Sequence, residues 1–188
     1  ETRAQYLDSN VLATPALAID ALGLELQRMG GIAHRLCAEA LSGEHPNLDR
    51  LARGHAALEN LQEVIGEFTS SIHRHQQDAD LVAPLPGAMR VIQYHVNMGE
   101  LAQELARLQP QTHVANAELA ALLTHLRADA DTVLRATRVN SEDWSRSAAQ
   151  DALTRFETGY QGTKTQLLRA GTAGEVSPRG MAALLEYG

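Results

Sequence analysis

Residues 51–72 read LARGHAALENLQEVIGEFTSSI, and this stretch decides the fold. Its large apolar residues recur at Leu51, Leu58, Ile65 and Ile72, with Leu61 and Phe68 between them. Alternating steps of three and four residues place such side chains on one face of an α-helix. A helix with a single apolar face needs partner helices to bury that face, so the stretch predicts a helical bundle.

The same spacing predicts a helix on each side of this one. Thr14 is a suitable N-cap for the preceding helix, and Pro15 suits its first position because the missing N–H costs nothing there. The predicted apolar stripe of this helix is Ile19, Leu22, Leu26, Met29, Ala33, Leu36 and Ala40. The helix after the Pro-rich residues 83–87 is predicted to bury Val91, Tyr94, Met98, Leu101, Leu105 and Leu108, and to stop at Pro110.

Three further helices are predicted in the second half of the chain. The stripe of the fourth is Leu119, Leu122, Leu126, Ala130 and Val133, and that of the fifth is Leu153, Phe156, Tyr160, Thr163 and Leu167. Ser141 is the predicted cap of the fifth, and Ser177–Pro178 opens a short sixth. The expected fold is all-α: two tandem antiparallel three-helix bundles at residues 14–110 and 111–188, leaving open whether the second is truncated.

Composition narrows the classes of function. The 188 residues carry a net charge of −7 with dispersed basic residues, which argues against a nucleic-acid-binding surface. No apolar run is long enough to cross a bilayer. Phosphate-loop, HExxH, G-x-S-x-G and paired-cysteine motifs are lacking, so we expect no enzyme. The single cysteine, Cys37, sits beside the apolar stripe of its helix and is expected to be a buried small hydrophobe.

Two segments carry a resemblance to a known family. YLDSNVLATPALAIDAL (residues 6–22) resembles the segment that follows the last membrane span in bacterial sodium/phosphate (Na/Pi) cotransporter-family proteins. GYQGTKTQLLRAGTAGEVSPRGMAALLEY (residues 159–187) resembles the close of their cytoplasmic PhoU-like domain, where a long helix ends in a Gly-rich turn. The resemblance covers nearly the whole chain and is most specific at these two ends.

This resemblance implies a regulatory or interaction domain on the cytoplasmic side of the bacterial inner membrane. Residues 1–13 would be a linker from a membrane domain, and the chain would act in phosphate uptake through protein contacts. The implied partners are its own transmembrane transporter domain or a cytoplasmic regulatory protein, with a homodimer also open and no nucleic acid. The alternatives are a free-standing PhoU-like metal-binding regulator of the phosphate response and a helical scaffold without ligands.

The resemblance also implies metal-binding carboxylates that face outward from the middle helices. Oxygen ligands of this kind suit iron, manganese, magnesium or calcium. In GHAALENL (residues 54–61), Ala57 replaces one family acid and Glu59 remains, with His55 one turn earlier. In VNMGELAQE (residues 96–104), Val96 replaces another, and Glu100 stands at the aspartate position. Glu59, Glu100 and His55 are therefore only weak metal candidates, and no cofactor is expected beyond a divalent ion.

Two further expectations concern the packing of the first bundle. Leu58, Ile65, Phe68, Leu101 and Leu105 are predicted to be buried between the helices of the first bundle. Gly30 and Gly31 interrupt a helical stripe at a cost of about 1 kcal/mol each relative to Ala, which favours a close approach of another helix at this point.

Overall fold

The structure is a computed structural model that describes residues 3–42, 46–75, 82–108, 116–138, 144–174 and 176. All of its regular elements in this part of the chain are helices. Its elements there are η1 (Ser9–Ala13, a 3₁₀ helix), α1 (Pro15–Ser42), α2 (Leu48–His75), α4 (Leu85–Leu108), α5 (Ala117–Ala136) and α6 (Arg146–Thr172). The all-α prediction is confirmed. The predicted sixth helix, from Ser177 onward, lies outside the described residues.

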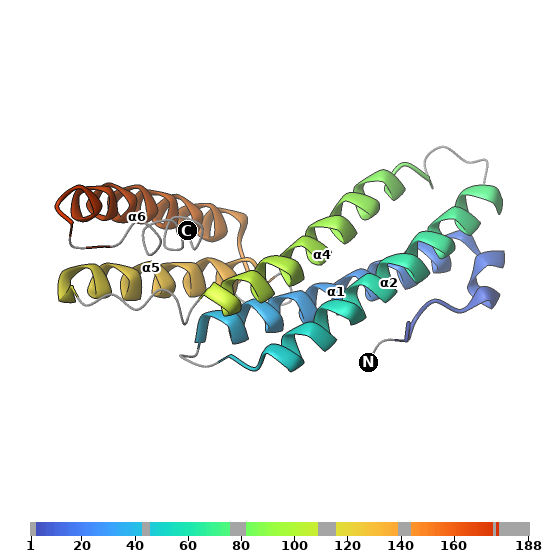
Figure 1. Cartoon of the computed structure of the whole chain (residues 1–188). Helices are drawn as coiled ribbons and strands as arrows, with labels where there is room; N and C mark the ends of the chain where they lie inside the picture. Colours follow the sequence, from blue (N-terminus) through green and yellow to red (C-terminus); the bar gives the residue numbers. More distant parts are fainter. Residues whose placement is uncertain are drawn as a thin grey trace. The chain divides into compact units, whose positions relative to one another are not determined.

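The chain divides into two compact units. Unit 1 combines Glu1–Cys37 with Asn47–Gln103, and unit 2 combines Ala38–Pro46 with Glu104–Gly188. Unit 1 therefore holds η1, α2 and most of α1 and α4, whereas α5 and α6 belong to unit 2. Figure 1 shows α1, α2 and α4 side by side within the first unit and α5 beside α6 within the second.

The centre of unit 1 is the apolar face of α2. All six residues of the predicted apolar stripe of α2 are buried: Leu51, Leu58, Leu61, Ile65, Phe68 and Ile72. On α1, most of the predicted stripe is buried as well, while Ile19 and Leu26 are half-buried. Ala18, Ala21 and Ile32 complete that face. Periodicity alone therefore locates the inner faces of these two helices.

The prediction for α4 is wrong about the face. Leu101 is 61% exposed, Tyr94 is 58% exposed, and Leu105 is only half-buried. The buried residues of this helix are instead Leu85, Ile92, Val96, Gly99, Ala102 and Ala106. Both series have helical spacing, and the helix buries the one with smaller side chains.

Close approach between helices explains that choice. A Cβ added at Gly99 of α4 would lie 2.7 Å from Cδ1 of Leu58 on α2, and one added at Gly54 of α2 would lie 2.4 Å from Cδ2 of Leu36 on α1. A Cβ added at Gly30 of α1 would lie 3.1 Å from the His95 ring on α4. The glycine and alanine side of α4 thus lets three helices pack at short range, as expected for Gly30.

The helix ends follow local chemistry, with two departures from prediction. α1 begins at Pro15, as predicted. The Pro-rich residues 83–87 were expected to separate helices, but α4 already begins at Leu85, and Ala88 N donates to Pro84 O at 3.0 Å. Prolines fit here because the first turn of a helix needs no N–H donors.

The second departure concerns α6. This helix begins at Arg146, and its N-cap is Ser145, whose hydroxyl accepts from Ala148 N at 3.1 Å. The predicted cap, Ser141, is too early in the chain to serve this helix. A serine at either position has the required side chain, so propensity could not choose between them.

Unit 2 is built on the packing of α5 against α6. Buried residues on α5 are Leu119, Leu123 and Leu126, and those on α6 are Ala152, Thr163, Leu167 and Ala170. Leu119, Leu126, Thr163 and Leu167 were predicted. The other predicted positions are half-buried, except Leu153, which is exposed.

Candidate functional site

The three weak metal candidates do not assemble a site. His55 and Glu59 are one turn apart on α2, with 3.9 Å between His55 Nδ1 and Glu59 Oε2. Glu100 is exposed on α4, next to Gly99, against which the His55 ring packs. Among the described residues, no group of three or more His, Cys, Asp or Glu side chains is placed to hold a metal ion.

The positions where the family resemblance places further acids point inward. Ala57 and Val96 are both buried in unit 1. A carboxylate at either position would lose its hydration and would need a partner in the core. The correspondence with outward-facing ligand positions therefore fails in geometry as well as in residue type.

Three histidines lie where the helices of unit 1 meet. The ring of His95 packs on Gly30 of α1, and its Nδ1 is buried without a hydrogen-bond partner. The ring of His55 packs on Gly99 of α4, and its Nε2 is likewise buried and unpartnered. Burial lowers the pKa of His95 below 6.5, and the charge of His34 on α1 lowers this pKa further. The interior of unit 1 thus favours neutral His95.

Cys37, predicted to be a buried small hydrophobe, is half-buried. Burial raises the pKa of its thiol to about 11, and its Sγ lies 3.6 Å from Met98 O on α4. The thiolate is the reactive form of cysteine, so this side chain is inert at neutral pH.

Sequence reasoning missed Glu25, a residue of α1 whose side chain is fully buried, with 0% exposure. Its Oε2 accepts hydrogen bonds from the backbone N–H groups of Gln5 at 2.8 Å and Tyr6 at 2.9 Å. Its Oε1 accepts from Arg28 Nε at 2.6 Å, and Arg28 Nη2 donates to Arg3 O at 3.0 Å. The segment before α1 is therefore fixed to α1 by a charged hydrogen-bond network.

No periodic pattern identifies such a residue in advance. Glu25 occupies a position between Leu22 and Met29 on the buried face of α1, and a lone acid there reads as an interruption of the stripe. Only the fold brings Gln5 and Tyr6 to it. The Glu25–Arg28 spacing of three residues is the one available signal, since it matches an intrahelical ion pair.

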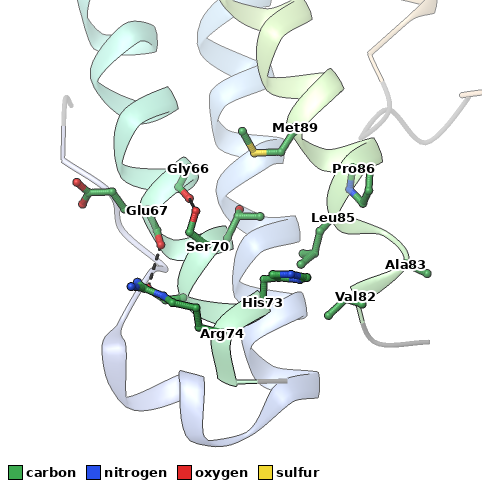
Figure 2. A pocket seen from close by; sticks show the side chains of 12 residues that line it. Gly66, Glu67, Ser70, His73, Arg74, Val82, Ala83, Leu85, Pro86 and Met89 are labelled. Carbon is green, nitrogen blue, oxygen red and sulfur yellow. Dashed lines mark hydrogen bonds between the residues drawn. The ribbon is translucent and has the colours of Figure 1, made fainter. Parts of the chain in front are cut away.

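An open groove lies beside the C-terminal turns of α2 and the start of α4 (Figure 2). Its volume is about 1160 Å³, and its walls combine apolar side chains of α4, including Leu85 and Met89, with polar residues of α2. Arg74 Nη2 donates to Ser71 Oγ at 3.1 Å, and Ser71 Oγ donates to Glu67 O at 3.0 Å. These polar groups bond to one another within α2, and they form no set of groups converging on a ligand.

Two rows of large apolar side chains stand out on the surface of the described part of unit 1. One is on α1, where Leu17 and Leu24 lie seven residues apart and are exposed. The other, which we call the outer stripe, consists of Val91, Tyr94, Met98 and Leu101 on α4; Met98 is half-buried and the other three are exposed. Large side chains exposed in a row on a helix mark surfaces for protein contact more often than single exposed ones do. These surfaces are the strongest functional candidates of the described chain.

No protein-family model, no curated protein and no solved structure matches this chain. Within the described residues, no helix has the length and hydropathy that a membrane span requires.

Proposed function

We propose that this chain is the PhoU-like regulatory and interaction domain of a sodium-dependent phosphate transporter-type membrane protein. It would lie on the cytoplasmic side of the bacterial inner membrane and act through protein contacts. The resemblance of residues 6–22 and 159–187 supports this assignment. The observation that carries it is the fixed segment before α1.

Glu25 gives that segment a mechanical role. Residues 1–13 are the proposed connection to a membrane domain, and a free connection would not transmit movement. Here, Gln5 N and Tyr6 N donate to one buried carboxylate, and Arg28 adds a bond to Arg3 O. A displacement of the preceding chain would therefore reach α1 directly.

The exposed side chains of Leu17 and Leu24 supply a contact surface next to this connection. They lie on α1, just beyond η1, and seven residues place them on one side of the helix. Apolar contacts of this kind suit the membrane domain itself or a cytoplasmic regulatory protein. The proposal thus assigns the start of α1 to both attachment and recognition.

The proposed fold in full is two three-helix bundles. In unit 2, α5 and α6 leave a groove of about 220 Å³ between the start of α5 and the end of α6, near Leu119, Leu122 and Ala170. A third helix opening at Ser177–Pro178 would supply the apolar residues Leu184 and Leu185 to cover such a surface. The PhoU-like assignment requires such paired bundles.

Transport measurements on the full-length protein test the function. The complete reading frame is expected to encode apolar segments of about 20 residues before Glu1. Sodium-driven phosphate uptake into vesicles would be compared for the intact protein and for one lacking residues 14–188. We expect the deletion to change how uptake responds to phosphate. A reading frame without such segments, or uptake unchanged by the deletion, would overturn the proposal.

A variant pair tests the role of Glu25. Glu25→Ala should shift uptake regulation in the direction of the deletion, and exchange of the Gln5 and Tyr6 amide hydrogens should accelerate. Glu63→Ala, on the exposed surface of α2, is the matched control and should alter neither measurement. Faster exchange without any change in uptake would remove the coupling role and leave Glu25 a purely structural residue.

A further inference from the structure

α4 carries two apolar faces, and the core of unit 1 uses only one of them. Ile92, Val96 and Gly99 face the neighbouring helices. The outer stripe follows a second series, with Val91 39% exposed, Tyr94 58% exposed and Leu101 61% exposed. At 3.6 residues per turn, this series points about 130° away from the buried one around the helix axis, so the two series form separate faces.

The outer stripe has the spacing of a coiled coil. Its steps are three, four and three residues, which are the a and d positions of a heptad with Val91 and Met98 at a and Tyr94 and Leu101 at d. Leu105 and Leu108 continue the same spacing to the end of α4. A heptad pattern of this kind on a helix that already buries another face points to a second helix as its partner.

The charged residues beside the stripe indicate which helix that is. Arg90, Asn97 and Glu104 are exposed and occupy successive g positions, each directly before an a position of the heptad. Arg90 and Glu104 are equally far from Asn97 in sequence, and their charges are opposite. Two antiparallel copies of α4 related by a two-fold axis beside Val96 and Asn97 would bring each Arg90 near Glu104 of the other copy.

A parallel pair lacks this complementarity. In parallel coiled coils, g positions face e positions of the partner, so Arg90 would meet His95 and Glu104 would meet no cation. Antiparallel pairing also sets Val91 against Leu101 and Tyr94 against Met98, so that every apolar residue of the outer stripe is used once.

We propose that two copies of this chain associate through α4 as an antiparallel, two-fold symmetric pair. The outer stripe forms the apolar seam, and Arg90 of each copy pairs with Glu104 of the other. A symmetric interface of this kind is the commonest in homo-oligomers. Because the seam has few side chains, the pair is expected to dissociate at micromolar concentrations.

Sedimentation velocity of the full 188-residue chain from about 1 to 200 µM tests the pairing. Leu101→Glu should abolish the dimer without reducing helical circular dichroism, because Leu101 is exposed in the single chain. Leu168→Glu, which changes an exposed leucine on α6, is the control and should leave the dimer intact. A chain that stays monomeric at all concentrations, or a dimer that survives Leu101→Glu, overturns the proposal.

Charge reversal tests the antiparallel register. Arg90→Glu alone and Glu104→Arg alone should each weaken the dimer by about tenfold or more, since like charges would then face each other. The double variant restores opposite charges and should recover the original dissociation constant to within about threefold. Failure of the double variant to recover, with both single variants weakened, overturns the register.

Discussion

The imidazole of His95 lies at the contact between α1 and α4, where its neutral form is favoured. Its ring lies on Gly30, its Nδ1 is buried without a partner, and His34 from α1 is the charged group that acts on it. Both burial and His34 disfavour the imidazolium. The residue therefore links the packing of unit 1 to pH.

The direction in which pH changes the unfolding free energy follows from the lowered pKa of His95. Well above pH 6.5, His95 is neutral in both the folded and the unfolded chain, so it contributes no pH dependence there. As the pH falls below 6.5, the unfolded chain takes up a proton that the folded chain refuses, and stability is lost down to the lowered pKa of the folded state.

Denaturant unfolding at pH 7.5 and 5.5 measures the contribution of His95. We expect His95→Gln, which is neutral at every pH, to show a smaller loss of unfolding free energy between these values than the unchanged protein. His125 is exposed on α5, and His125→Gln should keep the original loss. An equal loss in the His95 variant would contradict the link.

The metal content of the purified protein also depends on single residues. We expect protein purified without chelator to lack stoichiometric iron, manganese or zinc by elemental analysis, because Ala57 and Val96 cannot ligate and both lie in the core. Bound metal that disappears in Glu59→Ala or Glu100→Ala would favour the metal-binding regulator instead.

At the scale of the element, α2 and α4 show what periodicity can and cannot predict. The α2 face was predictable because its large apolar residues form a single series. α4 has two series, and larger side chains favoured the wrong one. Gly99 and Ala102 decide the buried face by allowing close approach, and no property of α4 alone reveals that Leu58 would fill the space beside Gly99.

Leucine truncation separates the two faces. Leu58→Ala, fully buried on α2, should cost about 2–5 kcal/mol of unfolding free energy. Leu101→Ala should cost less than about 1 kcal/mol when measured at concentrations where the chain is monomeric, because its side chain is exposed. Comparable losses for both variants would show that Leu101 belongs to the buried face of α4, as periodicity predicted.

Two glycines of α2 form a matched pair for testing close approach. A Cβ at Gly54 would lie 2.4 Å from buried Leu36, whereas a Cβ at Gly66 would meet nothing within 4 Å. Gly54→Ala should lower the unfolding free energy by about 1–3 kcal/mol through overpacking. Gly66→Ala should raise it by about 0.5–1 kcal/mol through helix propensity. Equal effects of both variants would show that helix spacing at Gly54 is not limiting.

At the scale of the whole molecule, the candidate site was the least predictable part. Glu25 acts on Gln5 and Tyr6, which precede it by 20 and 19 residues, and their contact depends on how η1 turns the chain back. The heptad of the outer stripe, by contrast, was visible in sequence but was assigned to the core. A pattern gives the spacing of a face, and only the fold determines what that face meets.

Removal of residues 177–188 tests the proposed third helix of unit 2. Trp144, the only tryptophan of the chain, lies directly before α6 and reports on this unit by its fluorescence. We expect the shortened chain to lose about 2 kcal/mol or more in the transition that Trp144 reports, since apolar surface would be uncovered. An unchanged transition would argue against a third helix there.

The composition of the two units has a consequence for synthesis on the ribosome. Unit 1 is complete once Gln103 has left the exit tunnel, because it needs only Glu1–Cys37 and Asn47–Gln103. Ala38–Pro46 belongs to unit 2, yet it emerges before much of unit 1 and must wait for everything from Glu104 onward. At about 5–20 residues per second, synthesis from Pro46 to Gly188 takes roughly 7 to 28 seconds. The nascent chain can thus complete its first unit before the rest of the second unit has been made.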